Sequence, residues 1–275
     1  MTAPDAKEWV KALDTEYQEL IRNHVWEMVE RPKGAKVLKN KWGFVRKRNA
    51  KDEVCRYRTR ITIKGCQQQY GVNFWETYAP VAKAESVRFI LLLALYLGLF
   101  CRQVDFVAAF LNGPVGGVEI YMEQPDYFDD GMGRVCKLLQ SLYGLRQAPR
   151  IWYTMLGKYL RKCGFKRTKM NAGVYARRVG ENKIFVTVYV DGLLIVGTES
   201  DIEMVLVELH SKFKIKDLVN VKHLPGMEIT YVRGAHVDDL ADGVLREDLD
   251  EVQDAELQTG AHSAGEGQLS DARQP

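Results

Sequence analysis

The stretch "GVYARRVGENKIFVTVYVDGLLIVG", residues 173–197, contains three apolar runs separated by two turn signals. Gly180 to Asn182 supplies the first turn. The dipeptide Asp191-Gly192 supplies the second, because Asp-Gly is a strong signal for a two-residue hairpin loop and glycine accepts its positive φ. The stretch therefore predicts a meander of three antiparallel strands, with the Asp191 carboxylate at the tip of the second hairpin.

The segments around this meander mix helices and strands without the regular alternation of a parallel α/β sheet. Apolar spacing predicts helices over 3–22, 85–97, 149–165 and 200–212, and strands over 101–106 and 117–122. No internal repeat is evident. We expect an α+β fold built on an antiparallel sheet.

Composition narrows the class of protein. The chain has 275 residues, of which 46% are hydrophobic, enough for a sizeable core. Its five cysteines are odd in number and widely spaced, which indicates reduced thiols in an intracellular protein and predicts no zinc site. The longest apolar stretch, residues 89–101, is shorter than the roughly 18 to 20 residues of a membrane span, so we expect no membrane association.

The net charge of +3 is unevenly distributed along the chain. Residues 234–275 contain 11 Asp or Glu and 2 Arg, a net charge of −9, so residues 1–233 carry +12. The acidic segment has no aromatic residue and ends in Gly, Ser and Gln. We expect at most a short helix near 244–258 and disorder beyond it.

Basic residues cluster most densely in "KNKWGFVRKRNAKDEVCRYRTRITIKG", residues 39–65, which reads as two strands joined near 49–52. Lys and Arg alternate there with aromatic and aliphatic residues. Two readings stay open on this pattern. One is a solvated edge hairpin kept soluble by its charges. The other is a surface that grips the phosphates of a nucleic acid.

Two aspartates lie in apolar strands, where burial alone would not place them. Asp105 occurs in "RQVDFVAAFLNG", directly after the predicted apolar helix, and Asp191 lies at the hairpin tip. A single Asp at a strand end is more often a cap or turn residue than a ligand. Each aspartate alone is therefore weak evidence for a metal site.

The order of several motifs is more informative. From about Trp9 to Tyr231 the sequence resembles the reverse transcriptase domain of copia-type long-terminal-repeat retrotransposons. The motifs that carry the resemblance are "WVKALDTEYQELIRNHVWEMVERP", "KWGFVRKRN", "RYRTRITIKGCQQQYGVNFWETYAPVAKAESVRFIL", "QVDFVAAFLNG", "IYMEQPDYF", "SLYGLRQAPRIWY" and "VYVDGLLIVG".

This resemblance implies a right-hand polymerase fold. Fingers with the basic hairpin would span 5–70 and a palm with an antiparallel sheet 71–233, followed by the acidic tail 234–275, with the thumb missing or incomplete. It implies DNA synthesis directed by an RNA or DNA template with a primer and deoxynucleoside triphosphates. By family, such a protein works in the cytoplasm, in a virus-like particle, or in the nucleus. Ribonuclease H and integrase, the other domains of such polyproteins, have no motif in the remaining 42 residues.

The resemblance also implies a catalytic site with two Mg²⁺ ions held by carboxylates. Asp105 and Asp191 match two of the three expected metal ligands. The third, the second aspartate of a Tyr-x-Asp-Asp motif, is Gly192 here. We therefore expect strongly reduced or absent polymerase activity. The alternatives are a catalytically inactive protein that still binds nucleic acid and a folded remnant with neither property.

Four further residues match substrate-binding positions of the family. Phe110 would be a steric gate against a ribose 2′ hydroxyl, and Gln147 would line the incoming nucleotide. Arg60 and Lys64 would lie near the triphosphate, with Arg60 the stronger candidate. Phe110 is equally a candidate core aromatic. One departure is Pro225, which would remove a backbone donor from a strand expected to grip the primer.

Overall fold

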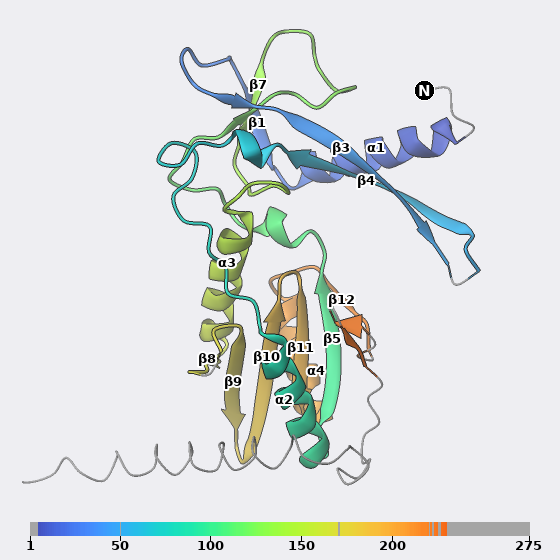
Figure 1. Cartoon of the computed structure of the whole chain (residues 1–275), viewed down its shortest axis with the longest axis vertical. Helices are drawn as coiled ribbons and strands as arrows, with labels where there is room; N and C mark the ends of the chain where they lie inside the picture. The colour runs from blue at the N-terminus through green and yellow to red at the C-terminus, as the bar shows by residue number, and fades with distance from the viewer. Residues whose placement is uncertain are drawn as a thin grey trace, which may run out of the picture.

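The computed structural model describes residues 5–49, 51–169, 171–219, 221, 223–224 and 227–229. Figure 1 shows two regions along the long axis of the molecule. The lower region is a six-stranded sheet, here called the main sheet, with helices on both faces. The upper region contains a four-stranded sheet and a long two-stranded hairpin. The predicted α+β class is confirmed.

All neighbouring strands of the main sheet are antiparallel, in the order β12-β5-β11-β10-β9-β8. The predicted three-stranded meander is confirmed as β9, β10 and β11, and β5 lies beside β11. The strands are β5 (Phe100–Phe106), β8 (Lys166–Arg167), β9 (Val174–Val179), β10 (Asn182–Tyr189), β11 (Gly192–Gly197) and β12 (Ile215–Asp217).

Helices cover both faces of this sheet. Helix α2 (Ala84–Tyr96) packs on one face, and α3 (Ala148–Lys162) and α4 (Glu199–His210) pack on the other. Strand β11 is buried on both sides: Leu193 and Ile195 join the α3–α4 core, while Leu194 and Val196 join the α2 core. Burial on both faces explains why its sequence is continuously apolar instead of alternating.

An aromatic cluster joins β5 to helix α3. Trp152 of α3 meets Phe106 of β5 edge to face, with ring centroids 4.7 Å apart, and meets Phe213 at 5.5 Å. Phe106 and Phe213 are also in contact, at 5.3 Å. Such pairs contribute about 0.5–1.5 kcal/mol each beyond their buried area. The cluster therefore fixes the strand that carries Asp105.

The upper four-stranded sheet has the order β1-β7-β6-β2, and its β2–β6 pair is parallel, which the sequence did not indicate. The predicted strand over 117–122 is reduced to the two residues of β6. The strands are β1 (Trp26–Val29), β2 (Val37–Leu38), β6 (Tyr121–Met122) and β7 (Val135–Leu138). Chain segments from both sides of residue 70 thus build one sheet. The domain division at 70 stays a prediction.

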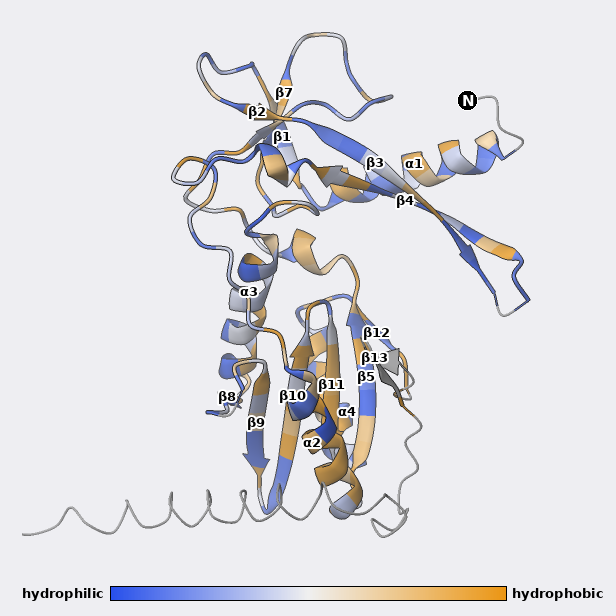
Figure 2. Cartoon of the chain, in the orientation of Figure 1, coloured by the Kyte–Doolittle hydropathy of each residue, from blue (hydrophilic) through white to orange (hydrophobic). Residues whose placement is uncertain are grey.

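The predicted basic hairpin is present as β3 (Asn40–Arg48) and β4 (Val54–Ile63), and it projects away from the rest of the molecule in Figure 1. Helix α1 (Ala6–Arg22) packs along β4, where the Thr59 hydroxyl donates to the Ala12 carbonyl at 2.9 Å. Figure 2 shows that β3 is largely hydrophilic, whereas the strands of the main sheet carry more hydrophobic residues.

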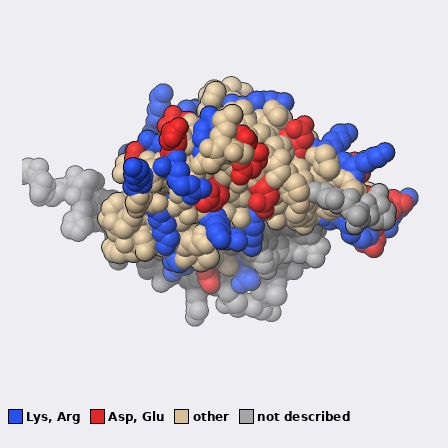
Figure 3. Space-filling view, turned by 90° about the horizontal axis from the view of Figure 1, so that it is seen from above, with Lys and Arg blue, Asp and Glu red and all other residues tan. Residues whose placement is uncertain are grey.

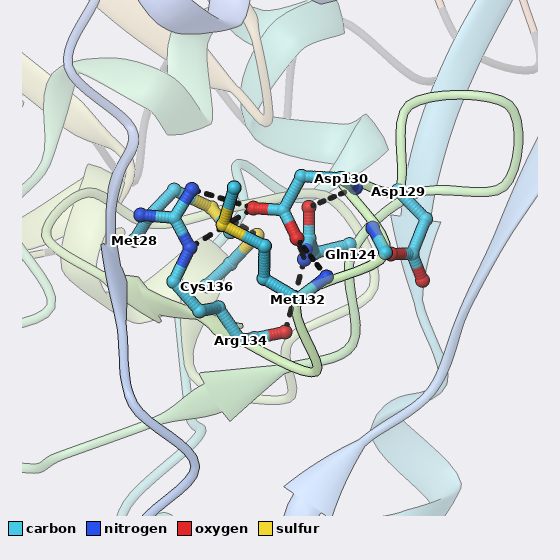
Figure 4. Close-up of polar contacts among 8 residues, drawn as sticks. Met28, Gln124, Asp129, Asp130, Met132, Arg134 and Cys136 are labelled. Atoms are coloured by element: carbon cyan, nitrogen blue, oxygen red, sulfur yellow. Dashed lines mark hydrogen bonds and ion pairs between the residues drawn. The ribbon is translucent and has the colours of Figure 1, made fainter.

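The loop between β6 and β7 braces the base of this hairpin. Its centre is Asp130, whose carboxylate accepts hydrogen bonds from the Gln124 amide, the Met132 backbone and the Arg134 guanidinium, as Figure 4 shows. These donors, Gln124 first, lower the pKa of Asp130 to about 2. The loop reaches the hairpin through the Trp42 indole, which donates to the Asp126 carbonyl at 3.1 Å.

The remaining elements are short: η1 (Gly65–Gln67), η2 (Ala109–Asn112), β13 (His223–Leu224) and β14 (Met227–Glu228). None of the helices in the described part of the chain combines the length and apolar character that crossing a membrane requires. The expectations for Pro225 and for the acidic segment 234–275 fall outside the described residues.

Candidate active site

The two predicted aspartates come together where β5 and β11 end side by side. Asp105 is the penultimate residue of β5, and its register partner on β11 is Gly192. Asp191 precedes Gly192, and its carbonyl accepts a hydrogen bond from the Phe106 backbone at 2.9 Å. Both aspartate side chains are exposed to solvent. Residues 86 positions apart therefore present their carboxylates at one end of the main sheet.

The predicted position of the hairpin turn was wrong by one residue. Tyr189 pairs with Gly192, so the two-residue loop is Val190-Asp191, and Gly192 is the first residue of β11. Val190 takes the positive φ, 50°, whereas Gly192 does not have one. The reason is tertiary: pairing with Asp105 on β5 draws Gly192 into the strand. The loop is also held by Trp152, whose indole donates to the Val190 carbonyl at 2.7 Å.

The electrostatics of Asp105 fit a cation-binding position. Its pKa is raised from the ordinary value, first by partial burial and then by the nearby negative charge of Asp191. Lys216, its register partner on β12, and Lys47 of the hairpin act in the opposite direction. Two carboxylates that repel one another bind a hard cation favourably, because the cation removes the repulsion.

A third carboxylate is missing from this junction. A Cβ atom at position 192 would lie 3.2 Å from Asp105 Oδ1, so an aspartate there would carry its carboxylate toward that of Asp105. Across the described ranges, no group of three His, Cys, Asp or Glu side chains is placed to hold a metal. The site therefore offers two carboxylates, which fits one divalent cation better than two.

An aromatic and cationic stack adjoins the carboxylates. Phe110, in η2, meets Tyr143 edge to face with ring centroids 5.2 Å apart. The Arg60 guanidinium of β4 lies over the other ring of this pair, 4.0 Å from the Tyr143 centroid. Asp191 is near enough to contribute to the raised pKa of Tyr143, whose first cause is burial. Phe110 also packs against both the upper and the lower cores, so it is a core aromatic beside the site.

Tyr143 was not singled out from the sequence, although it lies in the motif "SLYGLRQAP". No pattern in the sequence indicates that it stacks with Arg60, because the contact joins residues 83 positions apart. Lys64, the weaker of the two cationic candidates, immediately follows β4 and precedes η1. The structure thus places Arg60 within the stack that adjoins Asp191.

Gln147 is buried, and its amide is engaged by the segment that follows β4. Its Oε1 accepts from Gln68 at 2.9 Å, and its Nε2 donates to the Asn73 carbonyl at 2.9 Å. Gln68 in turn accepts from the Arg146 backbone. Gln147 therefore ties the start of α3 to the loop after η1. Its contact with an incoming nucleotide stays a prediction.

A close crossing of two backbones sets the hairpin over the site. Gly144 has a φ of 92°, and a Cβ atom there would lie 2.1 Å from the Ile63 carbonyl oxygen. A Cβ atom at Gly65 would lie 2.1 Å from the Gly144 carbonyl oxygen. The Ile63 backbone also donates to the Tyr143 carbonyl at 2.8 Å. Two glycines thus permit the approach that places Arg60 against Tyr143.

The hairpin separates its side chains between two faces. Phe44 and Tyr57 point toward α1, where Trp9 meets them at 5.2 and 4.7 Å. Trp42, on the same face, contacts Phe128 of the β6–β7 loop. The other face, here called the cationic face, turns toward the carboxylates. Arg60 on this face lies over the Tyr143 ring, and the positive charge of Lys47 acts to lower the pKa of Asp105. Seen from above in Figure 3, Lys and Arg side chains stand out along the edges of the molecule, including the end where the hairpin projects. The cationic face consists of Lys41, Lys47, Arg56, Arg58 and Arg60.

Comparison with known families agrees with this geometry. The family model for reverse transcriptase, an RNA-dependent DNA polymerase, matches residues 23–243. The chain belongs to the reverse transcriptase family. The matched range contains both carboxylates, the stack and the hairpin.

Similar proteins are long retrotransposon polyproteins. The chain is 38% identical over 237 residues to a retrovirus-related Pol polyprotein from transposon TNT 1-94 of Nicotiana tabacum, covering 85% of the chain and 18% of that protein. It is 34% and 33% identical over 234 residues to the Pol polyproteins from transposons RE1 and RE2 of Arabidopsis thaliana, covering 83% of the chain and 16% of each. The chain thus spans less than a fifth of the length of these relatives.

Proposed function

We propose that this reverse transcriptase domain corresponds to the polymerase core of a copia-type element, impaired by Gly192, with the main sheet as palm and the upper region as fingers. The observation that supports this best is the convergence of Asp105 and Asp191 beneath the cationic face. The predicted limits, 5–70 for the fingers and 71–233 for the palm, belong to this proposal, as does the missing or incomplete thumb.

The substrates follow from the chemistry of the site. The cationic face would hold the phosphates of a template and primer, since clustered Lys and Arg dominate affinity for nucleic acid. Arg60, pre-oriented on Tyr143, would contact the triphosphate of the incoming deoxynucleotide. Phe110, which is part of that stack, would close the ribose side, and Lys64 would add a more distant charge.

Asp105 and Asp191 would hold Mg²⁺ beside the primer end. When bound, Mg²⁺ would activate the attacking 3′ hydroxyl and stabilise charge on the transferred phosphoryl group. Asp105 and Asp191 would hold the cation, and Lys216 and Lys47 offset part of the negative charge at Asp105. With Gly192 in place of a third carboxylate, we infer weak or absent polymerisation.

Primer extension tests this proposal directly. The chain, the Gly192→Asp variant and an Asp105→Ala, Gly192→Asp double variant are compared on an RNA template with a DNA primer, in Mg²⁺ and in Mn²⁺. Of the three proteins, we expect only the Gly192→Asp single variant to extend the primer above background. Efficient extension by the unaltered chain would contradict the inferred impairment. Extension by the double variant would contradict the assignment of Asp105.

A second candidate function is nucleic-acid binding without catalysis, and the glycine at position 192 favours it. Binding of a primer-template is then expected to weaken steeply with salt, because phosphate contacts release counterions. Fluorescence anisotropy with a primer-template, a blunt duplex and a single strand separates the cases. A preference for the primer-template supports a retained polymerase cleft, and equal binding of all three supports a general basic surface.

A further inference from the structure

The cationic face of the hairpin carries closely spaced like charges. Lys47 and Arg56 are direct register partners, so their side chains share a face, and Arg58 and Arg60 follow at alternate positions of β4. Like charges placed directly opposite on a sheet destabilise it. A bound polyanion would relieve this repulsion.

These cations lack carboxylate partners within the described part of the chain. Arg46 and Arg48, also on β3, form ion pairs with Asp5 and Asp52 at 2.6 and 3.2 Å. No described acidic side chain lies within 4.0 Å of the charged nitrogens of the five residues of the cationic face. Glu16 of α1 lies near Arg58 and Arg60 but forms no ion pair with them. Burial raises the pKa of Glu16, and the two arginines offset only part of that rise. The cationic face is therefore available to a polyanion, whereas Arg46 and Arg48 already have carboxylate partners.

The same sequence contains a segment of matching charge. Residues 238–256 carry nine acidic residues and one arginine. They are Asp238, Asp239, Asp242, Glu247, Asp248, Asp250, Glu251, Asp254 and Glu256. This segment supplies most of the −9 charge that offsets the +12 of residues 1–233.

The acidic segment follows β12, the edge strand of the main sheet, in the sequence. Strand β12 pairs with β5 at the edge of the main sheet that carries Asp105, and the Leu218 backbone donates to Gln103 of β5. The last described residue, Ile229, lies nine residues before Asp238. Nine extended residues span up to about 30 Å. Figure 1 shows the hairpin projecting above this same edge of the sheet.

We propose that residues 238–256 bind the cationic face of their own chain and compete there with nucleic acid. The contacts are between the acidic side chains and Lys41, Lys47, Arg56, Arg58 and Arg60. The attached segment acts as an intramolecular polyanion, so nucleic acid has to displace it. This inference concerns the free protein and does not require that the chain polymerise DNA.

Zero-length carbodiimide cross-linking of the free full-length chain, read by mass spectrometry, tests the contact. Amide bonds are expected between residues 238–256 and Lys41 or Lys47. The matched control is a second set of exposed lysines: Lys158 and Lys162 of α3, and Lys166 of β8, the edge strand opposite β12. Equal cross-linking of both lysine sets, or yields that fall on dilution as for a second copy, would overturn the proposal.

Competition is measured by anisotropy with a labelled single-stranded oligonucleotide at about 0.1 M salt. Replacing the nine acidic residues by their amides is expected to tighten binding about tenfold, given an effective concentration of about 1 mM for a tethered segment and a weak contact of about 0.1 mM. The variant Lys41→Gln, Lys47→Gln, Arg56→Gln should lose most of this gain. The variant Lys158→Gln, Lys162→Gln, Lys166→Gln, with the same charge change, should keep it.

Suppose instead that the nine amide replacements tighten oligonucleotide binding equally in both triple variants. That result would show that the acidic segment acts through net charge alone, and would overturn the proposal. Failure of primer extension would leave it intact, because neither readout depends on catalysis. Thermal melting of every variant checks that the exposed substitutions leave the fold unchanged.

Discussion

Gly192 lies directly opposite Asp105 in the register of β11 and β5, and a Cβ atom at position 192 would lie only 3.2 Å from Asp105 Oδ1. Because Gly192 lacks a positive φ, an aspartate fits its backbone without strain. In Gly192→Asp we expect lower stability without a divalent cation, since three carboxylates then repel one another. Mg²⁺ should restore that stability.

Thermal melts with and without Mg²⁺ measure this effect. The variant Gly192→Asn is the control, because asparagine has the same shape as aspartate but carries no charge. We expect a larger Mg²⁺-dependent rise in melting temperature for the aspartate variant than for the asparagine variant or the unaltered chain. Identical responses from all three would show that position 192 does not face the cation site.

Gly144→Ala should destabilise the protein by about 2–4 kcal/mol, because it combines an unfavourable φ with a clash against the Ile63 carbonyl. Gly180→Ala is the matched control: its φ is also positive, at 58°, but a Cβ atom there has open space. The control should lose only about 1–2 kcal/mol. Urea denaturation of both variants gives the difference, and equal losses would refute a tight crossing.

Val190→Asn should stabilise the protein by about 0.5–1 kcal/mol. Val190 is a β-branched residue with a φ of 50°, a conformation that asparagine tolerates better. The carbonyl that accepts from Trp152 is unchanged by the substitution. Val190→Thr, which is also β-branched, should show no gain. Chemical denaturation of the three proteins decides, and a gain in the threonine variant would point to side-chain polarity as the cause.

Asp130 gives the protein a pH-dependent contribution to stability. Its folded pKa of about 2 lies below the ordinary 3.8, so the ionised form favours folding. This contribution is fully present above about pH 4 and is lost as the pH falls toward about 2. Asp130→Asn should therefore be less stable than the unaltered chain at pH 6, with the gap closing at acidic pH.

Denaturation curves at pH 6, 4 and 3 follow that gap. Asp129→Asn is a suitable control, because Asp129 accepts one backbone hydrogen bond, from Gly131, and lies outside the Arg134 contact. A gap between Asp130→Asn and the unaltered chain that stays constant with pH would contradict the assigned cause.

Arg60→Gln should weaken deoxynucleotide binding to a preformed complex with primer-template by about tenfold, as expected for loss of a charged contact. Lys64→Gln should weaken it by no more than about twofold, because Lys64 lies beyond β4 and outside the stack on Tyr143. Equilibrium titration with Mg²⁺ present compares the two. A larger loss in Lys64→Gln would reverse the ranking of these residues.

The sequence by itself determined the α+β class, the meander and the basic hairpin, because these depend on local signals: apolar spacing and turn residues. It also singled out Asp105 and Asp191, which the structure brings together, whereas their role as metal ligands stays a prediction. The gap at position 192 was also visible, since it is the absence of one side chain from a motif.

Tertiary structure alone decided the details of the site. The turn lies on Val190-Asp191 because pairing with β5 draws Gly192 into the strand, which outweighs the local preference of Asp-Gly. The stack of Arg60 on Tyr143 depends on a backbone crossing at Gly144, between segments about 80 residues apart in the sequence. Such contacts are set by the packing of distant segments, and no local pattern encodes which side chains will meet.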